Sequence, residues 1–315
     1  MEIVKKATRE SFGEALCELA ETNQDIVVLD ADLAAATKTG IFQKAYPERF
    51  FDCGIAEGNM VGVAAGMAAA GKIPVAAPFA MFTTGRAFEQ IRNSVAYPEL
   101  IVKIAGSHAG ISTGEDGATH QCIEDMGIMR AIPNMVVLNP ADHWEMKAAT
   151  KAAIEYNGPV YIRLGRLAID SFNDPETYTF EWGKGITLHE GDDVAVIATG
   201  LVVNESLKAV KALEEEGINA RLINIHTLKP IDREIVAKAA RETGRIITVE
   251  EHNVIGGLAD AVCEVVTEEC PVKVTRIGVQ DTFGFSGPAW ELLDKFGLTA
   301  PHIADVIRQV VAEKK

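Results

Sequence analysis

The sequence has few cysteines, no excess of basic residues and no long hydrophobic run. Its five cysteines form no CxxC pair and are odd in number, which predicts free thiols in a reducing compartment. The sequence has 30 Lys and Arg and 45 Asp and Glu residues, and the resulting net charge of −15 argues against a protein that binds nucleic acids or anionic membranes. No apolar run reaches the roughly 18–20 residues of a membrane span, and the N-terminus lacks a signal-peptide core. We therefore expect a cytoplasmic protein with no membrane or nucleic-acid partner.

Two common nucleotide-binding motifs are also missing. No G-x-x-x-x-G-K-[ST] sequence occurs, and the glycine that ends the expected strand at residues 193–200 begins GLVVNES rather than G-x-G-x-x-G. The sequence therefore argues against a P-loop or a Rossmann dinucleotide site.

Apolar runs that alternate with amphipathic helical segments predict a parallel α/β fold. VVL at residues 27–29 and VVL at residues 136–138 are continuously apolar, as strands buried on both faces are. The expected strands are 25–33, 49–55, 73–79, 100–107, 135–140, 159–165, 193–200, 220–226, 245–251 and 272–279.

The alternation breaks down between Leu167 and Gly191, a polar stretch that contains Pro175. We interpret this stretch as a domain boundary. The sequence thus predicts two doubly wound α/β domains, a parallel-sheet domain over 1–170 and a smaller α/β domain over 191–315, joined by a linker over 171–190.

The stretch GIAEGNMVGVAAGMAAAGKIP, residues 54–74, predicts a helix of small apolar residues from about Val61 to Ala70, ended by Gly71. Because this helix is apolar on nearly all sides, we expect it to be buried, with small residues that let another backbone approach closely. Glu57 stands at its N-terminus. It is either a charge partner of the helix end or a functional carboxylate.

Polar residues gather in the glycine-rich loop SHAGISTGEDGATHQ, residues 107–121, which follows an expected strand where parallel sheets place ligand sites. His108, Glu115, Asp116 and His120 could form a metal site, a solvated loop or a site for a polyhydroxylated substrate. The spacing lacks the i, i+4 histidine pair of zinc enzymes and no cysteine is placed to assist, so the sequence argues against a metal. Neutral histidine and ionised aspartate can each hold a hydroxyl, and histidine can pass a proton near pH 7.

Two other clusters follow neighbouring strands. Asp30 and Asp32 close one strand, and Phe79 and Phe82 are expected at the end of another. The rings of Phe79 and Phe82 could belong to the hydrophobic core or form a surface on which a ligand stacks. Phe88 is expected in the core, one helical turn from an isoleucine.

In combination, these segments resemble the C-terminal half of a transketolase. The resemblance runs from about Thr8 to the end of the chain. In order, its motifs read ATRES, DADL, GIAEGNM, PFAMF, HAGISTGEDGATHQ, IPNM, PVYIRLGR, LINIHTLKPID and VEEHNVIGGL. The resemblance implies that residues 1–170 are a pyrimidine-binding domain and residues 191–315 the family's C-terminal domain.

The resemblance also implies thiamine diphosphate as the cofactor. Glu57 matches the family glutamate that contacts N1′ of the cofactor's aminopyrimidine. By sharing a proton with N1′, this glutamate favours the imino form of the aminopyrimidine, whose N4′ can then remove the proton from C2 of the thiazolium. Phe79 and Phe82 match the aromatic pair that lines the pyrimidine pocket. Asp32 matches a residue near the thiazolium.

Substrate contacts are implied in the same way. His108, Asp116 and His120 match positions that handle sugar hydroxyls, and the two histidines are expected to take part in catalysis. Arg9 and Arg166 match phosphate-binding arginines, whose planar guanidinium suits two phosphate oxygens at once. The resemblance therefore implies sugar phosphates as substrates.

Three positions depart from the family pattern. A phosphate-contacting serine aligns with Ala36, although Thr37 is adjacent, and a third pocket aromatic aligns with Gly85. The family's HDS reads HAG here. These departures bear on chain-length preference and phosphate dependence, and leave the reaction class intact.

The family's diphosphate and magnesium site, a GDG motif with a downstream asparagine, has no counterpart; the nearest match is Glu115-Asp116-Gly117. We therefore predict the C-terminal subunit of a two-gene transketolase, whose N-terminal partner subunit would ligate Mg²⁺. An α2β2 assembly would transfer a two-carbon ketol unit from a ketose phosphate to an aldose phosphate, a reaction of the pentose phosphate pathway.

Three alternatives remain. A deoxyxylulose phosphate synthase usually has Asp where His108 stands, and reads AEQH where this chain reads AEGN. The beta subunit of a pyruvate dehydrogenase-type enzyme shares the architecture but lacks a DGATHQ-like loop. A non-catalytic scaffold would need neither Glu57 nor the histidines and arginines of the site.

Overall fold

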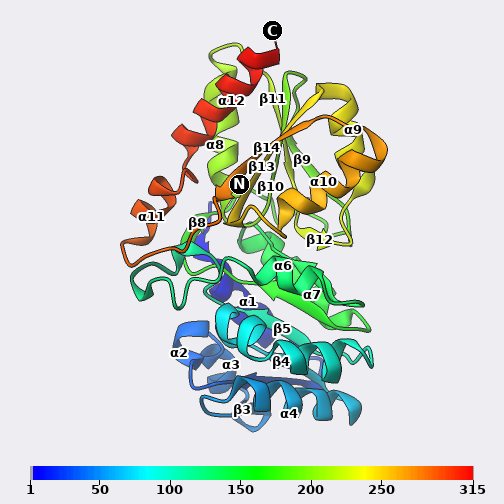
Figure 1. The fold of residues 1–315 in the computed structure, drawn as a ribbon. Helices are drawn as coiled ribbons and strands as arrows, with labels where there is room; N and C mark the ends of the chain where they lie inside the picture. The colour runs from blue at the N-terminus through cyan, green and yellow to red at the C-terminus, as the bar shows by residue number, and fades with distance from the viewer. Residues whose placement is uncertain (1–2, 315) are drawn as a thin grey trace.

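The first half of the chain builds a seven-stranded sheet in the order β12-β6-β7-β5-β4-β2-β3. The computed structural model describes residues 3–314, and Figure 1 shows this sheet in the lower half of the molecule. All neighbouring strands are parallel except β12, which runs antiparallel to β6. The strands are β2 (Ile26–Asp30), β3 (Phe50–Asp52), β4 (Ile73–Ala76), β5 (Lys103–Gly106), β6 (Val136–Leu138), β7 (Val160–Arg163) and β12 (Thr227–Lys229).

Helices cover both faces of this sheet because its strands are apolar on both sides. In β2, Val28 points into the core beneath α1, α3 and α7, whereas Leu29 points into the core beneath α4 and α6. The helical elements here are α1 (Thr8–Ala20), α2 (Ala34–Thr37), α3 (Gly40–Ala45), η1 (Pro47–Arg49), α4 (Glu57–Ala69), η2 (Met81–Arg86), α5 (Phe88–Gln90), η3 (Ile91–Ala96), η4 (Ile111–Asp116), α6 (Asp125–Arg130) and α7 (His143–Glu155).

The second half builds a five-stranded sheet in the order β14-β13-β10-β11-β9, parallel except for β9. Helices α8 and α12 pack on one face, and α9 and α10 on the other (Figure 1). The doubly wound α/β architecture is thereby confirmed. The elements are β9 (Ile186–His189), β10 (Val194–Ala198), α8 (Val202–Glu214), β11 (Ala220–Asn224), α9 (Arg233–Thr243), β13 (Arg245–Asn253), α10 (Leu258–Glu269), β14 (Lys273–Val279), α11 (Ala289–Lys295) and α12 (Ala300–Lys314).

The connection between the two sheets is more structured than the sequence suggests. Strand β8 (Ala168–Asp170) pairs with β1 (Lys5–Ala7), and β9 lies inside the segment 171–190 that was expected to be a linker. Strand β12 comes from the second half of the chain but joins the sheet of the first half through β6.

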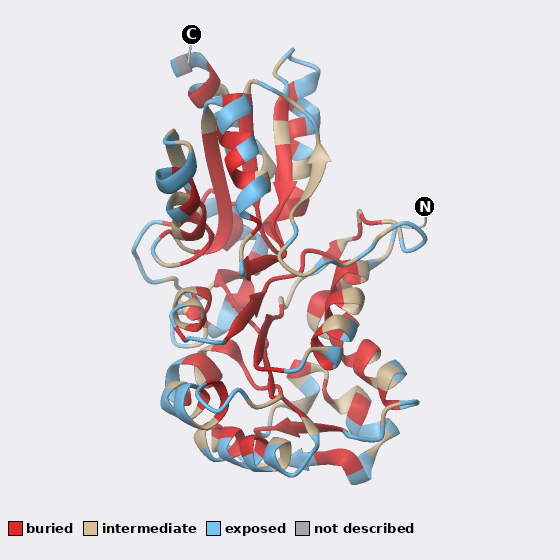
Figure 2. Ribbon diagram, turned by 90° about the vertical axis from the view of Figure 1, so that its right-hand side faces the viewer, coloured by how far each residue is buried: buried red, intermediate tan, exposed pale blue. Residues whose placement is uncertain are grey.

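The two domains share a hydrophobic core. One cluster runs from Met126 and Met129 on α6 to Leu228, Leu258 and Val262 of the second half. Figure 2 shows the central strands of both sheets as buried, with exposed residues on the outer surfaces of the helices and on loops. The loop 107–121, which follows β5, lies where the two halves meet.

Helix α4 is only half buried, contrary to the expectation of a fully buried helix. Its inner face packs on the sheet through Met60, Val61 and Ala64. Gly62 and Gly66 face outward, and a Cβ added at either glycine would meet nothing within 4 Å. One side of the helix therefore has no partner within the described part of this chain.

Within residues 3–314, no helix is both long enough and apolar enough to cross a membrane.

Candidate active site

Glu57 is the first residue of α4, so its carboxylate lies at the positive end of the helix dipole. Its side chain is only 1% exposed. Oε2 accepts a 2.7 Å hydrogen bond from Nη1 of Arg86, whose side chain remains about half exposed. The Arg86 guanidinium carbon lies 4.8 Å from the centre of the Phe82 ring. A buried carboxylate is thus linked through one arginine to an aromatic face.

The two aromatic residues and the two histidines form one cluster. The Phe79 and Phe82 rings stack with centroids 5.9 Å apart, and the His108 ring stacks on Phe79 at 4.0 Å. The His120 ring meets Phe82 edge-on at 5.1 Å. Residues 79, 82, 108 and 120, which are separated in sequence, therefore line one continuous surface.

The backbone that carries this cluster differs from the expectation of a strand ending at Phe79 and Phe82. Strand β4 ends at Ala76, and Phe82 lies on η2, a π-helix over Met81–Arg86. Phe79 keeps a single parallel bridge to Ser107. Because π-helical turns are rare and often occur at functional sites, η2 supports a role for this segment. Phe88 packs against the core, as expected.

His108 sits in a left-handed backbone conformation, with φ of 56°, and is 3% exposed. Nη1 of Arg9 lies 2.9 Å from its Nε2, and Oγ of Ser107 lies 2.9 Å from its Nδ1. Arginine only donates, so Nε2 must accept and Nδ1 must carry the proton. Burial, helped by the charge of Arg9, lowers the pKa of His108 to about 3. The imidazole is therefore neutral at pH 7, and the expectation that it titrates near neutrality is wrong for this histidine.

The two candidate phosphate-binding arginines flank His108. Nη1 of Arg9 also donates to the carbonyl of Ala36 at 2.6 Å, while its buried Nε has no hydrogen-bond partner among residues 3–314. Arg166 donates to the carbonyl of Thr113 and to Oε2 of Glu115. Desolvation, followed by the charge of Arg166, lowers the pKa of Arg9, which places the two cations near one another. Paired arginines at one rim suit a dianionic ligand.

Asp32 and Asp116 stand apart from these contacts. Both side chains are exposed. The backbone of Asp32 is in a left-handed conformation, with φ of 63°, and its N–H donates to Oδ1 of Asp52. The neighbouring Asp30 is fully buried and accepts from Thr37 and Thr39, so it holds its loop in place. Within residues 3–314, Asp32 and Asp116 therefore lack the hydrogen bonds and ring contacts that join the other predicted site residues. Their assignment to the site stays a prediction.

Two of the family departures have structural consequences. Thr37 is 1% exposed and donates to Asp30, so it is not free to replace the serine expected beside it. At Gly85, a side chain would meet Cε of Met81, so Met81 would have to move to admit an aromatic ring there.

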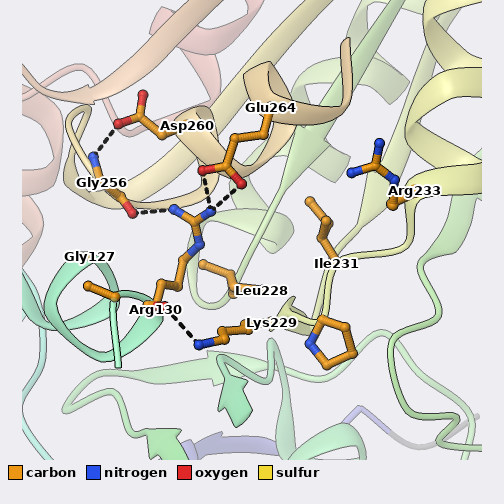
Figure 3. A pocket seen from close by; sticks show the side chains of 11 residues that line it. Gly127, Arg130, Leu228, Lys229, Ile231, Arg233, Gly256, Asp260 and Glu264 are labelled. Atoms are coloured by element: carbon orange, nitrogen blue, oxygen red, sulfur yellow. Dashed lines mark hydrogen bonds and ion pairs between the residues drawn. The ribbon is translucent and has the colours of Figure 1, made fainter. Parts of the chain in front are cut away.

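Two cavities bear on the location of the site. One, of about 440 Å³, is lined by Met81, Phe82, Arg86, Ala118, Thr119 and Phe283, and so adjoins the Glu57–Arg86 pair. Another, of about 490 Å³, lies between the two halves and includes Arg130, Lys229 and Glu264 in its walls (Figure 3). None of the expected site residues lines the second cavity. We place the candidate site at the first, because its wall includes Phe82, which contacts the rings of Phe79 and His120, and Arg86, which pairs with Glu57.

The residues present fit the aminopyrimidine part of thiamine diphosphate. Phe82 offers an aromatic face, and Glu57 offers a buried carboxylate oxygen for a ring nitrogen, provided that Arg86 moves aside. In the described part of the chain, no three His, Cys, Asp or Glu side chains are grouped so that they could hold a metal ion.

Arg86 and Glu251 are contacts that the sequence reasoning missed. Arg86 follows the PFAMF motif by four residues and ends the helical turn that carries Phe82, so its proximity to that ring could have been expected from the sequence. Glu251 lies in the motif VEEH, and its carboxylate accepts a 2.6 Å bond from the backbone N–H of Ser112. No local pattern indicates that contact, which joins residues 139 positions apart.

Comparison with known proteins establishes the class. The family model of the transketolase pyrimidine binding domain matches residues 4–170, and that of the transketolase C-terminal domain matches residues 183–303. The chain therefore belongs to the transketolase family, whose members depend on thiamine diphosphate.

Within that family, the chain is similar along nearly its whole length to proteins that are themselves sections or subunits of a transketolase. It is 49% identical to a protein described as a transketolase C-terminal section from Methanocaldococcus jannaschii, over 97% of this chain and 96% of that protein. It is 44% identical to the 6-deoxy-6-sulfo-D-fructose transketolase subunit SqwH of Clostridium sp. strain MSTE9, over 97% and 95%. A solved split-gene transketolase, an inactive β4 tetramer, superposes with a TM-score of 0.91 at 51% identity, covering 98% and 100% of the two chains. Human transketolase is 37% identical over 98% of this chain and 50% of its own length.

Proposed function

We propose that this chain is the C-terminal subunit of a two-component transketolase that moves a two-carbon ketol unit from a ketose phosphate to an aldose phosphate. The observation that carries the proposal is the chain of contacts from Glu57 through Arg86 and Phe82 to His108 and Arg9. A carboxylate, a stacking surface, a neutral histidine and paired arginines meet the separate needs of a cofactor ring, sugar hydroxyls and a phosphate.

Thiamine diphosphate supplies a nucleophilic carbon and an electron sink when it is bound. The chain's own residues have simpler tasks. Glu57 would hold a proton at the ring nitrogen of the bound cofactor, and Phe79 and Phe82 would keep water from one face of that ring. His108, neutral and buried, would accept a hydrogen bond from a substrate hydroxyl at Nε2 once the Arg9 guanidinium turns to the substrate phosphate.

The diphosphate and Mg²⁺ belong, in this proposal, to an N-terminal partner subunit. Support comes from the missing GDG motif and from relatives that are themselves subunits or sections. The open face of α4, with Gly62, Val63 and Gly66 outward, offers a surface against which a second copy or the partner can pack closely. The assembly is proposed to be α2β2.

Co-purification with the N-terminal subunit tests the proposal. The complex, given thiamine diphosphate and Mg²⁺, is expected to convert xylulose 5-phosphate and ribose 5-phosphate with normal saturation kinetics. A folded complex that binds the cofactor but transfers no ketol unit to any aldose phosphate would contradict the proposal and favour a non-catalytic scaffold.

Sulfonated donors and pyruvate form two further arms of the assay. The similarity to a 6-deoxy-6-sulfo-D-fructose transketolase subunit makes a sulfonate in place of the phosphate the second candidate for the anion that the arginines bind. A 1-deoxy-D-xylulose-5-phosphate synthase of Geobacter sulfurreducens is 39% identical over 96% of this chain and 48% of its own length, which is why pyruvate with glyceraldehyde 3-phosphate is included. Preference for pyruvate would replace the proposed reaction with that of the synthase.

A further inference from the structure

The 107–121 loop carries three candidate substrate residues, yet much of its support comes from the other half of the chain. Its centre, η4, begins after Gly110 and bears the buried Ser112 and Thr113. The backbone N–H of Ser112 donates to Oε1 of Glu251, at 2.6 Å, and Glu251 stands on β13 of the second domain.

Glu251 lies so close to the backbone at position 110 that glycine is favoured there. A Cβ added at Gly110 would lie 2.4 Å from both Oε1 and Cδ of Glu251, and Gly110 has φ of +85°, which favours glycine. The carboxylate therefore lies directly beneath the turn that links His108 to Ser112.

Hydrogen bonds continue from this turn to His108. Oγ1 of Thr113, the residue after Ser112, donates to the carbonyl of His108 at 2.6 Å and to that of Gly110 at 3.0 Å. These bonds close the loop on itself, so that fixing Ser112 also fixes the backbone from which the His108 ring extends toward Phe79.

Glu251 is itself held rigidly. Arg163 donates from Nη2 to the carbonyl oxygen of Glu251 at 2.9 Å and pairs with Asp125 at 2.7 Å. Glu251 is 2% exposed and Arg163 is 4% exposed, so these bonds are shielded from water. A buried charge-assisted bond of this kind is roughly twice as strong as a neutral one.

We propose that Glu251 is a positioning residue for the substrate loop, and that the second domain sets the orientation of His108 through the contact between Glu251 and Ser112. The inference rests on the proposed function, because the loop matters only where His108 meets a substrate. It gives the second domain a task in an active site whose other candidate residues all lie in the first.

Glu250 provides a matched control. Glu250 is as buried as Glu251 and also accepts hydrogen bonds from backbone N–H groups. Its donors are Leu258 and Ala259 at the start of α10, rather than residues of the 107–121 loop. Loss of either carboxylate removes a buried acceptor from β13, and only one of them touches the 107–121 loop.

The first measurement is backbone hydrogen exchange by mass spectrometry on the folded chain, which needs no activity. Glu251→Ala is expected to speed exchange across 107–121 by roughly 5- to 150-fold, as leaving a buried backbone N–H without its acceptor implies. Glu251→Gln, which keeps an acceptor oxygen, should restore most of the protection. Glu250→Ala should act on 257–261 instead. Unchanged exchange in 107–121, or equal loss from both alanine variants, would overturn the proposal.

The second measurement uses the reconstituted complex. Glu251→Ala is expected to raise KM for a phosphorylated donor about threefold to tenfold while the Kd for thiamine diphosphate stays within twofold, since the cofactor contacts are untouched. Glu251→Gln, which keeps the acceptor oxygen, should return KM to near its unmodified value. Equal weakening of donor and cofactor would show a general structural role and contradict the inference. If no complex turns over, the proposed function fails, while the exchange result still decides the role of Glu251.

Discussion

Replacement of Arg166 by alanine separates phosphate binding from structural support. Arg166 follows β7, its side chain is 32% exposed, and it donates to the carbonyl of Thr113 and to Glu115. Glu115 is itself largely exposed, so the ion pair contributes little to stability. Loss of the guanidinium should therefore cause only a small fall in Tm.

The effect on substrate should be larger. A charge-assisted bond to phosphate contributes about 1.5–3 kcal/mol, which corresponds to roughly a 10- to 150-fold change in affinity. Because the phosphate lies far from the reacting carbons, this binding is equal in the ground and transition states, so KM rises and kcat is nearly unchanged. An unphosphorylated donor, hydroxypyruvate, should behave as with the unmodified enzyme.

Steady-state kinetics with xylulose 5-phosphate and hydroxypyruvate, beside a melting curve, measure both effects. Glu115→Gln is the matched control: it removes the ion pair, keeps the guanidinium, and should leave KM for the phosphorylated donor unchanged or lower. If Arg166→Ala impaired both donors equally, or if Glu115→Gln reproduced its effect, the assignment of Arg166 to phosphate would be refuted.

Three further predictions concern the cofactor, assembly and pH. Glu57→Gln should lower kcat by roughly 10²- to 10⁴-fold with unchanged Tm, because an amide cannot exchange a proton with the cofactor ring; fast C2–H exchange in D₂O would contradict this. Gly66→Arg, on the open face of α4, should block subunit association measured by light scattering while leaving the monomer folded. Burial, then Asp142, raises the pKa of Glu145 from 4.5 to about 8. The unfolded chain therefore binds fewer protons between those values, so the free energy of unfolding should fall as pH rises from about 5 to 8. Urea titrations should show that Glu145→Gln flattens this fall; an unchanged slope would refute it.

The sequence was most informative where local chemistry decides the structure. Continuous apolar runs predicted the parallel strands, since a strand with helices on both faces can carry few polar side chains. The end of α4 near Gly71 also followed from local signals, whereas its start did not: the helix was expected from about Val61 and begins at Glu57.

Other features depend on contacts between distant residues and gave no local signal. The π-helix that carries Phe82 spans only 6 residues, too few for its period to show in the sequence, and β12 joins the first sheet only because the second domain folds back upon β6. The small-residue helix α4 was expected to be buried, but a sequence pattern does not say whether the covering surface belongs to the same chain. The low pKa of His108 likewise arises from burial and from Arg9, which is 99 residues away.

The central claim is that this chain completes an active site with a separate N-terminal subunit. The most direct test is a titration of that subunit with this chain, at saturating thiamine diphosphate and Mg²⁺, while ketol transfer from xylulose 5-phosphate to ribose 5-phosphate is followed. We predict no turnover by either chain alone and a linear rise in rate that stops at an equimolar ratio. Turnover by this chain alone, or a folded equimolar complex without turnover, would contradict the claim.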